Sequence, residues 1–92
     1  VPRVTGVTVD GRALTDGQTL ALTAGDNATV QISGTNLVAG AVTMKYNNQS
    51  VALSVASDKL VTGSITVLNG TMPIVITWPD GSISASIRGD VL

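Results

Sequence analysis

The segment Ile74-Val75-Ile76-Thr77-Trp78-Pro79-Asp80-Gly81-Ser82-Ile83-Ser84-Ala85-Ser86-Ile87 decides the fold class of this chain. Apolar residues stand at every second position on both sides of Pro79-Asp80-Gly81. Side chains of a strand point alternately to opposite faces, so each half predicts a strand with one buried face. Proline and glycine are turn formers, so we expect these strands to form a hairpin around a three-residue turn.

The same period of two recurs along the whole chain, and helical spacing of three and four is nowhere sustained. Asn69-Gly70 lies between two apolar alternations and predicts a second hairpin, with a two-residue loop. Pro73 cannot donate a backbone hydrogen bond, so its strand must be on an edge at its start, or bulged there. The predicted strands are 3–9, 18–23, 27–34, 41–47, 49–56, 60–68, 71–78 and 82–88.

These segments predict a single all-β domain over residues 1–92, with antiparallel strands that each have one apolar face. Two facing sheets would bury those faces in a sandwich of about seven to eight strands, although a small closed barrel would show the same alternation. The residues expected to point inward are Val7, Val9, Leu20, Leu22, Val30, Ile32, Val42, Met44, Leu53, Val55, Ile65, Val67, Ile74, Ile76, Trp78, Ile83 and Ile87.

Two parts of the chain resemble the IPT/TIG group of immunoglobulin-like domains. The segment Ala24–Leu37, with a glycine turn, an alternating strand and then Gly34-Thr35-Asn36-Leu37, is similar to the region of the group's B strand. The segment Ile74–Ser82 resembles its last hairpin. The paired glycine that precedes the B strand in the group is replaced by Ala24-Gly25. The resemblance implies an immunoglobulin-like antiparallel sandwich and a non-catalytic module of bacterial or phage surface, secreted or virion proteins.

The composition removes several kinds of chemistry. The chain has no Cys, His or Glu, so it offers no cysteine or histidine ligand and no Ser-His or Cys-His catalytic pair. We therefore expect no enzyme, no cofactor and no metal. The five basic residues are scattered singly and the net charge is −1, which argues against nucleic-acid binding. No apolar run approaches the roughly 20 residues of a membrane helix.

Several short motifs can be interpreted in two ways, as a functional site or as an ordinary structural feature. Arg88-Gly89-Asp90 is an integrin-type tripeptide, but a strand that ends at Arg88 with a Gly-Asp turn explains it as well. Trp78 and Tyr46, the only aromatic residues, could stack sugars but follow the phase of inward-facing positions. Asp16 and Asp80 could converge across loops, although Asp-Gly pairs ordinarily form turns. Three segments match the N-glycosylation pattern: Asn27-Ala28-Thr29, Asn48-Gln49-Ser50 and Asn69-Gly70-Thr71.

Two functional hypotheses follow. In the first, the chain is a module cut from a longer extracellular, cell-surface or virion protein, where it acts as a spacer or weak adhesion unit beside other domains of the same polypeptide. In the second, it is a dedicated carbohydrate-binding or cell-adhesion domain. Its ligand-binding residues would then lie in loops rich in amides and hydroxyls, namely Asn27, Thr35-Asn36, Asn47-Asn48-Gln49 and Asn69.

Overall fold

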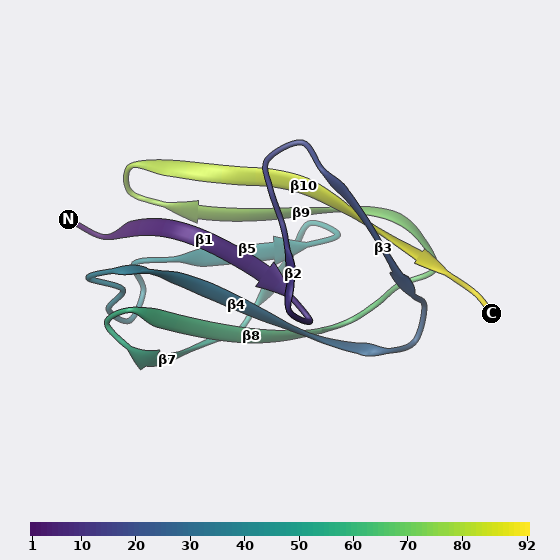
Figure 1. Ribbon diagram of the computed structural model, residues 1–92, viewed down its shortest axis with the longest axis horizontal. Coiled ribbons are helices and arrows are strands. Elements are labelled where there is room, and N and C mark those ends of the chain that lie inside the picture. The colour runs from purple at the N-terminus through teal and green to yellow at the C-terminus, as the bar shows by residue number, and fades with distance from the viewer.

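The computed structural model describes residues 1–92 and consists of two five-stranded sheets packed face to face (Figure 1). The first sheet has the strand order β2-β1-β4-β8-β7, and the second has the order β3-β10-β9-β5-β6. The first sheet comprises β2 (Arg12–Ala13), β1 (Arg3–Val9), β4 (Asn27–Thr35), β8 (Leu60–Thr66) and β7 (Leu53–Ser57). The second comprises β3 (Thr19–Thr23), β10 (Gly81–Asp90), β9 (Gly70–Trp78), β5 (Thr43–Tyr46) and β6 (Gln49–Val51).

This topology is that of an immunoglobulin-like sandwich. In that fold, strands A, B, E and D form one sheet and strands G, F and C form the other. Here β1-β4-β8-β7 corresponds to the first set and β10-β9-β5 to the second. The predicted sandwich is therefore confirmed, and the closed barrel that the alternation also allowed is excluded.

The prediction of purely antiparallel sheets is wrong at one strand. β3 runs parallel to β10, with Thr19 opposite Ser86 and Thr23 opposite Asp90. Alternation along a strand reports which face is buried and carries no information on the direction of the neighbour. The direction is set by the segment 14–18, which takes the chain from β2 in the first sheet to β3 in the second.

Two features raise the number of strands from the expected seven or eight to ten. The predicted strand 49–56 is divided at Ala52, where the chain leaves the second sheet as β6 and enters the first sheet as β7. β2 has only two residues, which is too short for an alternating pattern to reveal it. It pairs with β1 through a turn at Asp10-Gly11, where both residues have positive φ.

The two predicted hairpins have different outcomes. β9 and β10 do form a hairpin, but Trp78 is opposite Gly81, so the loop contains only Pro79 and Asp80. The hairpin at Asn69-Gly70 is wrong, because β8 belongs to the first sheet and β9 to the second. The intervening link is anchored by backbone hydrogen bonds between Val67 and the turn at Gly25-Asp26, which hold the chain as it crosses.

Pro73 lies at the start of β9, as its missing donor requires. β9 is an inner strand, but its neighbour β5 pairs only with residues 74–77. Pro73 therefore has β10 on one side and no strand on the other, and its carbonyl accepts a hydrogen bond from the Asn47 N–H. The prediction that this strand is at an edge at its start is confirmed.

The core fills the space between the sheets and matches most of the predicted inward residues. Val55 is the exception: it is 43% exposed, because β7 is the outermost strand of its sheet. Leu22, Leu53, Trp78 and Ile83 are only partly buried. The buried cluster is Val7, Val9, Leu14, Leu20, Ala28, Val30, Ile32, Leu37, Val42, Met44, Tyr46, Val61, Ile65, Val67, Ile74, Ile76, Ala85 and Ile87.

Candidate functional site

The sandwich is an elongated body of 41 × 22 × 22 Å, and the two chain termini lie at its opposite ends (Figure 1). We call these ends the N pole and the C pole. Figure 1 places the segment 36–42 and the β7–β8 and β9–β10 turns at the N pole. It places the β8–β9 link at the C pole and the β5–β6 turn in the half of the body toward that pole. A candidate site built from loops must therefore belong to one pole or the other.

The predicted polar loops are divided between the poles. Asn27 and Asn69 are at the C pole and Asn47-Asn48-Gln49 lies in the half of the body toward it, whereas Thr35-Asn36 is at the end of β4, at the N pole. The Asn27 Oδ1 accepts a hydrogen bond from the Thr66 hydroxyl at 3.0 Å, which joins the start of β4 to the end of β8. Three of the four segments can thus contribute to one surface, and Thr35-Asn36 cannot.

The β5–β6 turn presents two of these amides in a fixed conformation. Asn47 and Asn48 have φ of 54° and 62°, and Tyr46 is paired with Gln49 across them. This is the geometry of a type I′ hairpin turn, which asparagine tolerates better than most residues. Beside the turn lies a shallow groove of about 420 Å³, whose polar lining consists of Gln49, Ser50, Ser64 and Thr66. Hydroxyl and amide groups of this kind can hydrogen-bond a neutral polar ligand.

Neither aromatic residue is fully exposed. Tyr46 is 6% exposed, and its hydroxyl accepts a hydrogen bond from the Leu68 N–H at 2.9 Å. Trp78 is half-buried and packs against the core at the N pole. The expectation that both rings contribute to the core is confirmed for Tyr46 and holds in part for Trp78.

Arg88-Gly89-Asp90 is not in a loop. β10 continues through Asp90 and is paired on both sides, with β9 and with β3. Gly89 is buried, and the Arg88 Nε is 3.3 Å from the Asp90 carboxylate on the same face. An integrin-type ligand needs its two charges separated on an exposed bend, so this geometry does not support that reading. The expected exit turn after Arg88 is also wrong.

The three glycosylation-like asparagines are exposed, at the start of β4, in the β5–β6 turn and in the β8–β9 link. Two of the aspartates, by contrast, accept hydrogen bonds from the backbone. Asp10 accepts a hydrogen bond from the Thr29 N–H, and Asp16 accepts one from the Ser84 N–H. Asp80 is exposed in the β9–β10 turn. No three acidic side chains gather in a way that could hold a metal ion.

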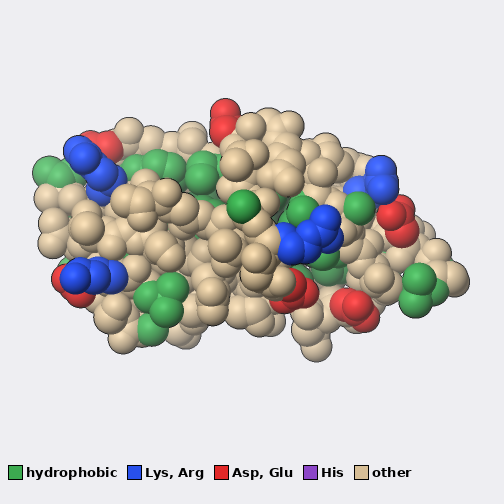
Figure 2. Space-filling model, viewed as in Figure 1, with side chains coloured by type: hydrophobic (Ala, Val, Ile, Leu, Met, Phe, Trp, Pro, Cys, Tyr) green, Lys and Arg blue, Asp and Glu red, His purple; other side chains and the backbone are tan.

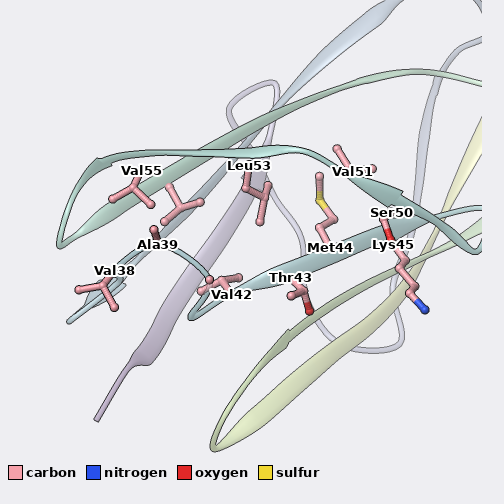
Figure 3. A pocket seen from close by; sticks show the side chains of 12 residues that line it. Val38, Ala39, Val42, Thr43, Met44, Lys45, Ser50, Val51, Leu53 and Val55 are labelled. Atoms are coloured by element: carbon pink, nitrogen blue, oxygen red, sulfur yellow. The ribbon is translucent and has the colours of Figure 1, made fainter.

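Sequence reasoning missed an apolar cleft of about 510 Å³ that opens between the two sheets (Figure 3). Its walls are β5 and β6 on one side and β7 on the other, and the segment 38–42 closes one end. Val38 and Val55 face each other at the mouth and are 59% and 43% exposed. Val55 was expected in the core, but no pattern in the sequence placed Val38 near it.

The surface is mostly uncharged. Figure 2 shows a few basic and acidic side chains, some of them next to each other, on a face that is otherwise formed largely by backbone and by polar side chains, with small hydrophobic patches. No helix in the structure could span a membrane.

No family model and no curated protein matches this sequence. Among solved structures, the chain is similar over its full length to the fragment described as domains 4 and 5 of the S-layer protein SbsC. The TM-score is 0.57 and the sequence identity 19%. The chain spans 47% of the length of that fragment. A Dscam1 Ig7 domain, isoform 5, matches 99% of the chain and is covered over 96% of its own length, with 15% identity and a TM-score of 0.43. At 19% identity the likeness to the SbsC fragment shows the fold alone, and it agrees with the immunoglobulin-like strand order of the two sheets.

Proposed function

We propose that this chain is a non-catalytic immunoglobulin-like module of a larger bacterial or phage surface, secreted or virion protein, where it acts as a structural spacer or weak adhesion unit. The observation that carries the proposal is the placement of the termini at opposite poles of a 41 Å body. A module that the chain enters at one end and leaves at the other adds its whole length to a row of domains.

Three further observations support this role. A domain of similar fold occurs in the S-layer protein SbsC, with a TM-score of 0.57. The two motif-like segments that resemble IPT/TIG domains form β4 and the β9–β10 hairpin, as that resemblance implies. Of the carboxylates, Asp10 and Asp16 accept backbone hydrogen bonds, Asp90 is paired with Arg88, and Asp80 lies exposed in a turn. We propose on this basis that the module lies outside the cell, at the cell surface or on a virion.

Small-angle X-ray scattering of a three-copy head-to-tail fusion tests the spacer role. We expect the maximum dimension to grow with each copy by roughly the 41 Å length of the body. A fusion joined by a long Gly/Ser linker is the control, because flexible linkers let the copies take many relative positions. If the direct fusion scatters as a compact body of side-by-side domains, the spacer role is wrong.

The second candidate is a carbohydrate-binding module, favoured by the groove beside the β5–β6 turn. Each neutral hydrogen bond to a sugar hydroxyl contributes only about 0.5–1.5 kcal/mol, so binding without a stacked aromatic ring needs many copies. A glycan array probed with a multivalent display of the domain is the test. Gln49→Ala should abolish any signal, whereas Gln31→Ala, an exposed amide on β4, should leave it unchanged. A blank array with folded protein contradicts this candidate.

A further inference from the structure

The four edges of the two sheets are not equally protected. β2 is two residues long, and β6 is confined to three residues between the Asn47-Asn48 turn and the crossing at Ala52. The outer edge of β3 is contacted by Arg12, whose guanidinium donates a hydrogen bond to the Ala21 carbonyl at 3.0 Å. Short strands and covering charged side chains are the ordinary means by which proteins prevent edge-to-edge pairing. β7 has neither.

β7 is five residues long, Leu53-Ser54-Val55-Ala56-Ser57, with no charge and no proline. It pairs only with β8, and no loop or turn backbone hydrogen bond reaches residues 53–57. Four of its five residues are exposed. The outward-facing N–H and C=O groups of this strand are therefore free to pair with another extended segment.

The apolar cleft lies directly beside this edge. Leu53 and Val55 point from β7 into the cleft, toward the wall formed by β5 and β6 (Figure 3). A strand added next to β7 would continue the first sheet, and its inward side chains would enter the open mouth between Val38 and Val55. The unpaired backbone groups of β7 and the apolar cleft beside it can therefore be filled by the same partner. That partner is an extended strand with small apolar residues at alternate positions.

We propose that the occupant is a second copy of this chain, paired antiparallel through its own β7. β7 has the alternation that the cleft requires, with Leu53 and Val55 on one face and Ser54 on the other. Because the strand is uncharged, two copies meet without the like-charge pairs that oppose strand pairing. A two-fold axis makes the contact self-complementary, so each copy shields the apolar mouth of the other.

The contact is small. An extra residue at Ala56 shifts the β7–β8 register and bends the end of the strand, so the regular part is Leu53–Val55. So short an edge buries less than the about 800 Å² per partner of a standard stable interface. The pairing is therefore a weak, concentration-dependent association, suited to modules held close together.

Sedimentation velocity of the isolated domain tests the proposal between about 10 μM and about 1 mM, the range in which weak complexes form. The wild-type protein should shift toward twice its 9.3 kDa mass as concentration rises. Val55→Lys places a charge at the mouth of the cleft and should raise the dissociation constant at least about tenfold. Ala13→Lys adds the same charge to β2, at the other edge of the same sheet, and should associate like the wild type.

Three results would overturn the proposal: a wild-type monomer throughout the range, association of Val55→Lys as strong as that of the wild type, or equal loss in Ala13→Lys. Circular dichroism establishes that both variants are folded. Hydrogen exchange gives an independent readout: the amides of residues 53–57 should become protected as the wild type is concentrated, and unchanged exchange there rejects β7 as the contact.

Discussion

Gly89 has no room for a side chain. A Cβ at this position would overlap the Leu68 carbonyl oxygen and lie 2.8 Å from a Val67 methyl group. The β8–β9 link crosses between the sheets over this residue of β10, so the glycine lets the backbones approach closely. Close packing against the β8–β9 link thus explains the glycine of Arg88-Gly89-Asp90.

Gly89→Ala should lower the free energy of unfolding by about 1–3 kcal/mol, the cost of overpacking a filled site, measured by urea denaturation. Gly6→Ala is the matched control, because a Cβ there meets no atom within 4 Å and its φ is not positive. Equal stability of the two variants would contradict the close approach of the link to β10.

Ile32 tests the core that the alternation predicts. It is fully buried on β4, opposite Val7 of β1 and Val61 of β8. Ile32→Ala should cost about 2–5 kcal/mol through lost burial and the cavity that remains, again measured in urea. The control Gln31→Ala changes the exposed neighbour and should stay close to the wild type. A near-neutral Ile32→Ala would show that β4 does not face the core through this residue.

At the residue scale, the sequence predicts burial well inside strands and poorly outside them. Tyr46 continues the inward phase of its strand and is buried. Leu14 and Leu37 are just as buried, but each lies in a segment that crosses between sheets, where no alternation applies. Val55 fails for another reason: alternation gives the face of a residue but not whether its strand is the last of the sheet.

At the scale of elements, the β5–β6 turn depends on left-handed backbone at Asn48. Asn48→Gly should be tolerated, because glycine adopts positive φ without strain. Asn48→Ala should lower the free energy of unfolding by about 1–2 kcal/mol, because a residue with a Cβ is strained in the left-handed region. Thermal unfolding of the two variants makes the comparison. Equal melting temperatures would contradict the type I′ turn.

Tyr46 links β5 to the crossing between β8 and β9. Tyr46→Phe keeps the ring in the core and removes only the acceptor of the Leu68 N–H. The free energy of unfolding should fall by about 1–3 kcal/mol, as expected when a partly buried donor is left without a partner. Hydrogen exchange of the Leu68 amide checks the cause: it should exchange faster in the variant. Unchanged protection would show that the tyrosine does not hold this link.

The sequence predicts the extent of the elements more closely than their connections. The ranges 3–9 and 27–34 agree with β1 and β4 to within one residue. Asn69-Gly70 has the residues of a hairpin turn, but the chain there changes sheets, because Val67 is tied to the β3–β4 turn. Turn residues permit a reversal of the chain and do not state which sheet receives the next strand. The parallel pairing of β3 was missed for the same reason, because the residues before it do not state which sheet receives the strand.

At the scale of the whole molecule, the candidate sites could not be read from the sequence. The groove beside the β5–β6 turn draws its lining from β5, β6 and β8 and from the links at Ala52 and Leu68, and the apolar cleft combines the segment 38–42 with both sheets. Such surfaces exist only once the strands are placed. What the sequence does indicate is the low-charge surface of Ser, Thr and Asn.

The central claim is that the chain enters at one pole and leaves at the other. Pulsed electron–electron double resonance, which measures the distance between two spin labels, tests it most directly. The chain has no cysteine, so introduced pairs label cleanly. Labels at Arg3→Cys and Asp90→Cys, the first residue of β1 and the last of β10, should be separated by a distance nearer to the 41 Å length than to the 22 Å width. The control pair Arg3→Cys and Asp80→Cys, both at the N pole, should give the shorter distance. A short Arg3–Asp90 distance, or the reverse order of the two pairs, would contradict the account.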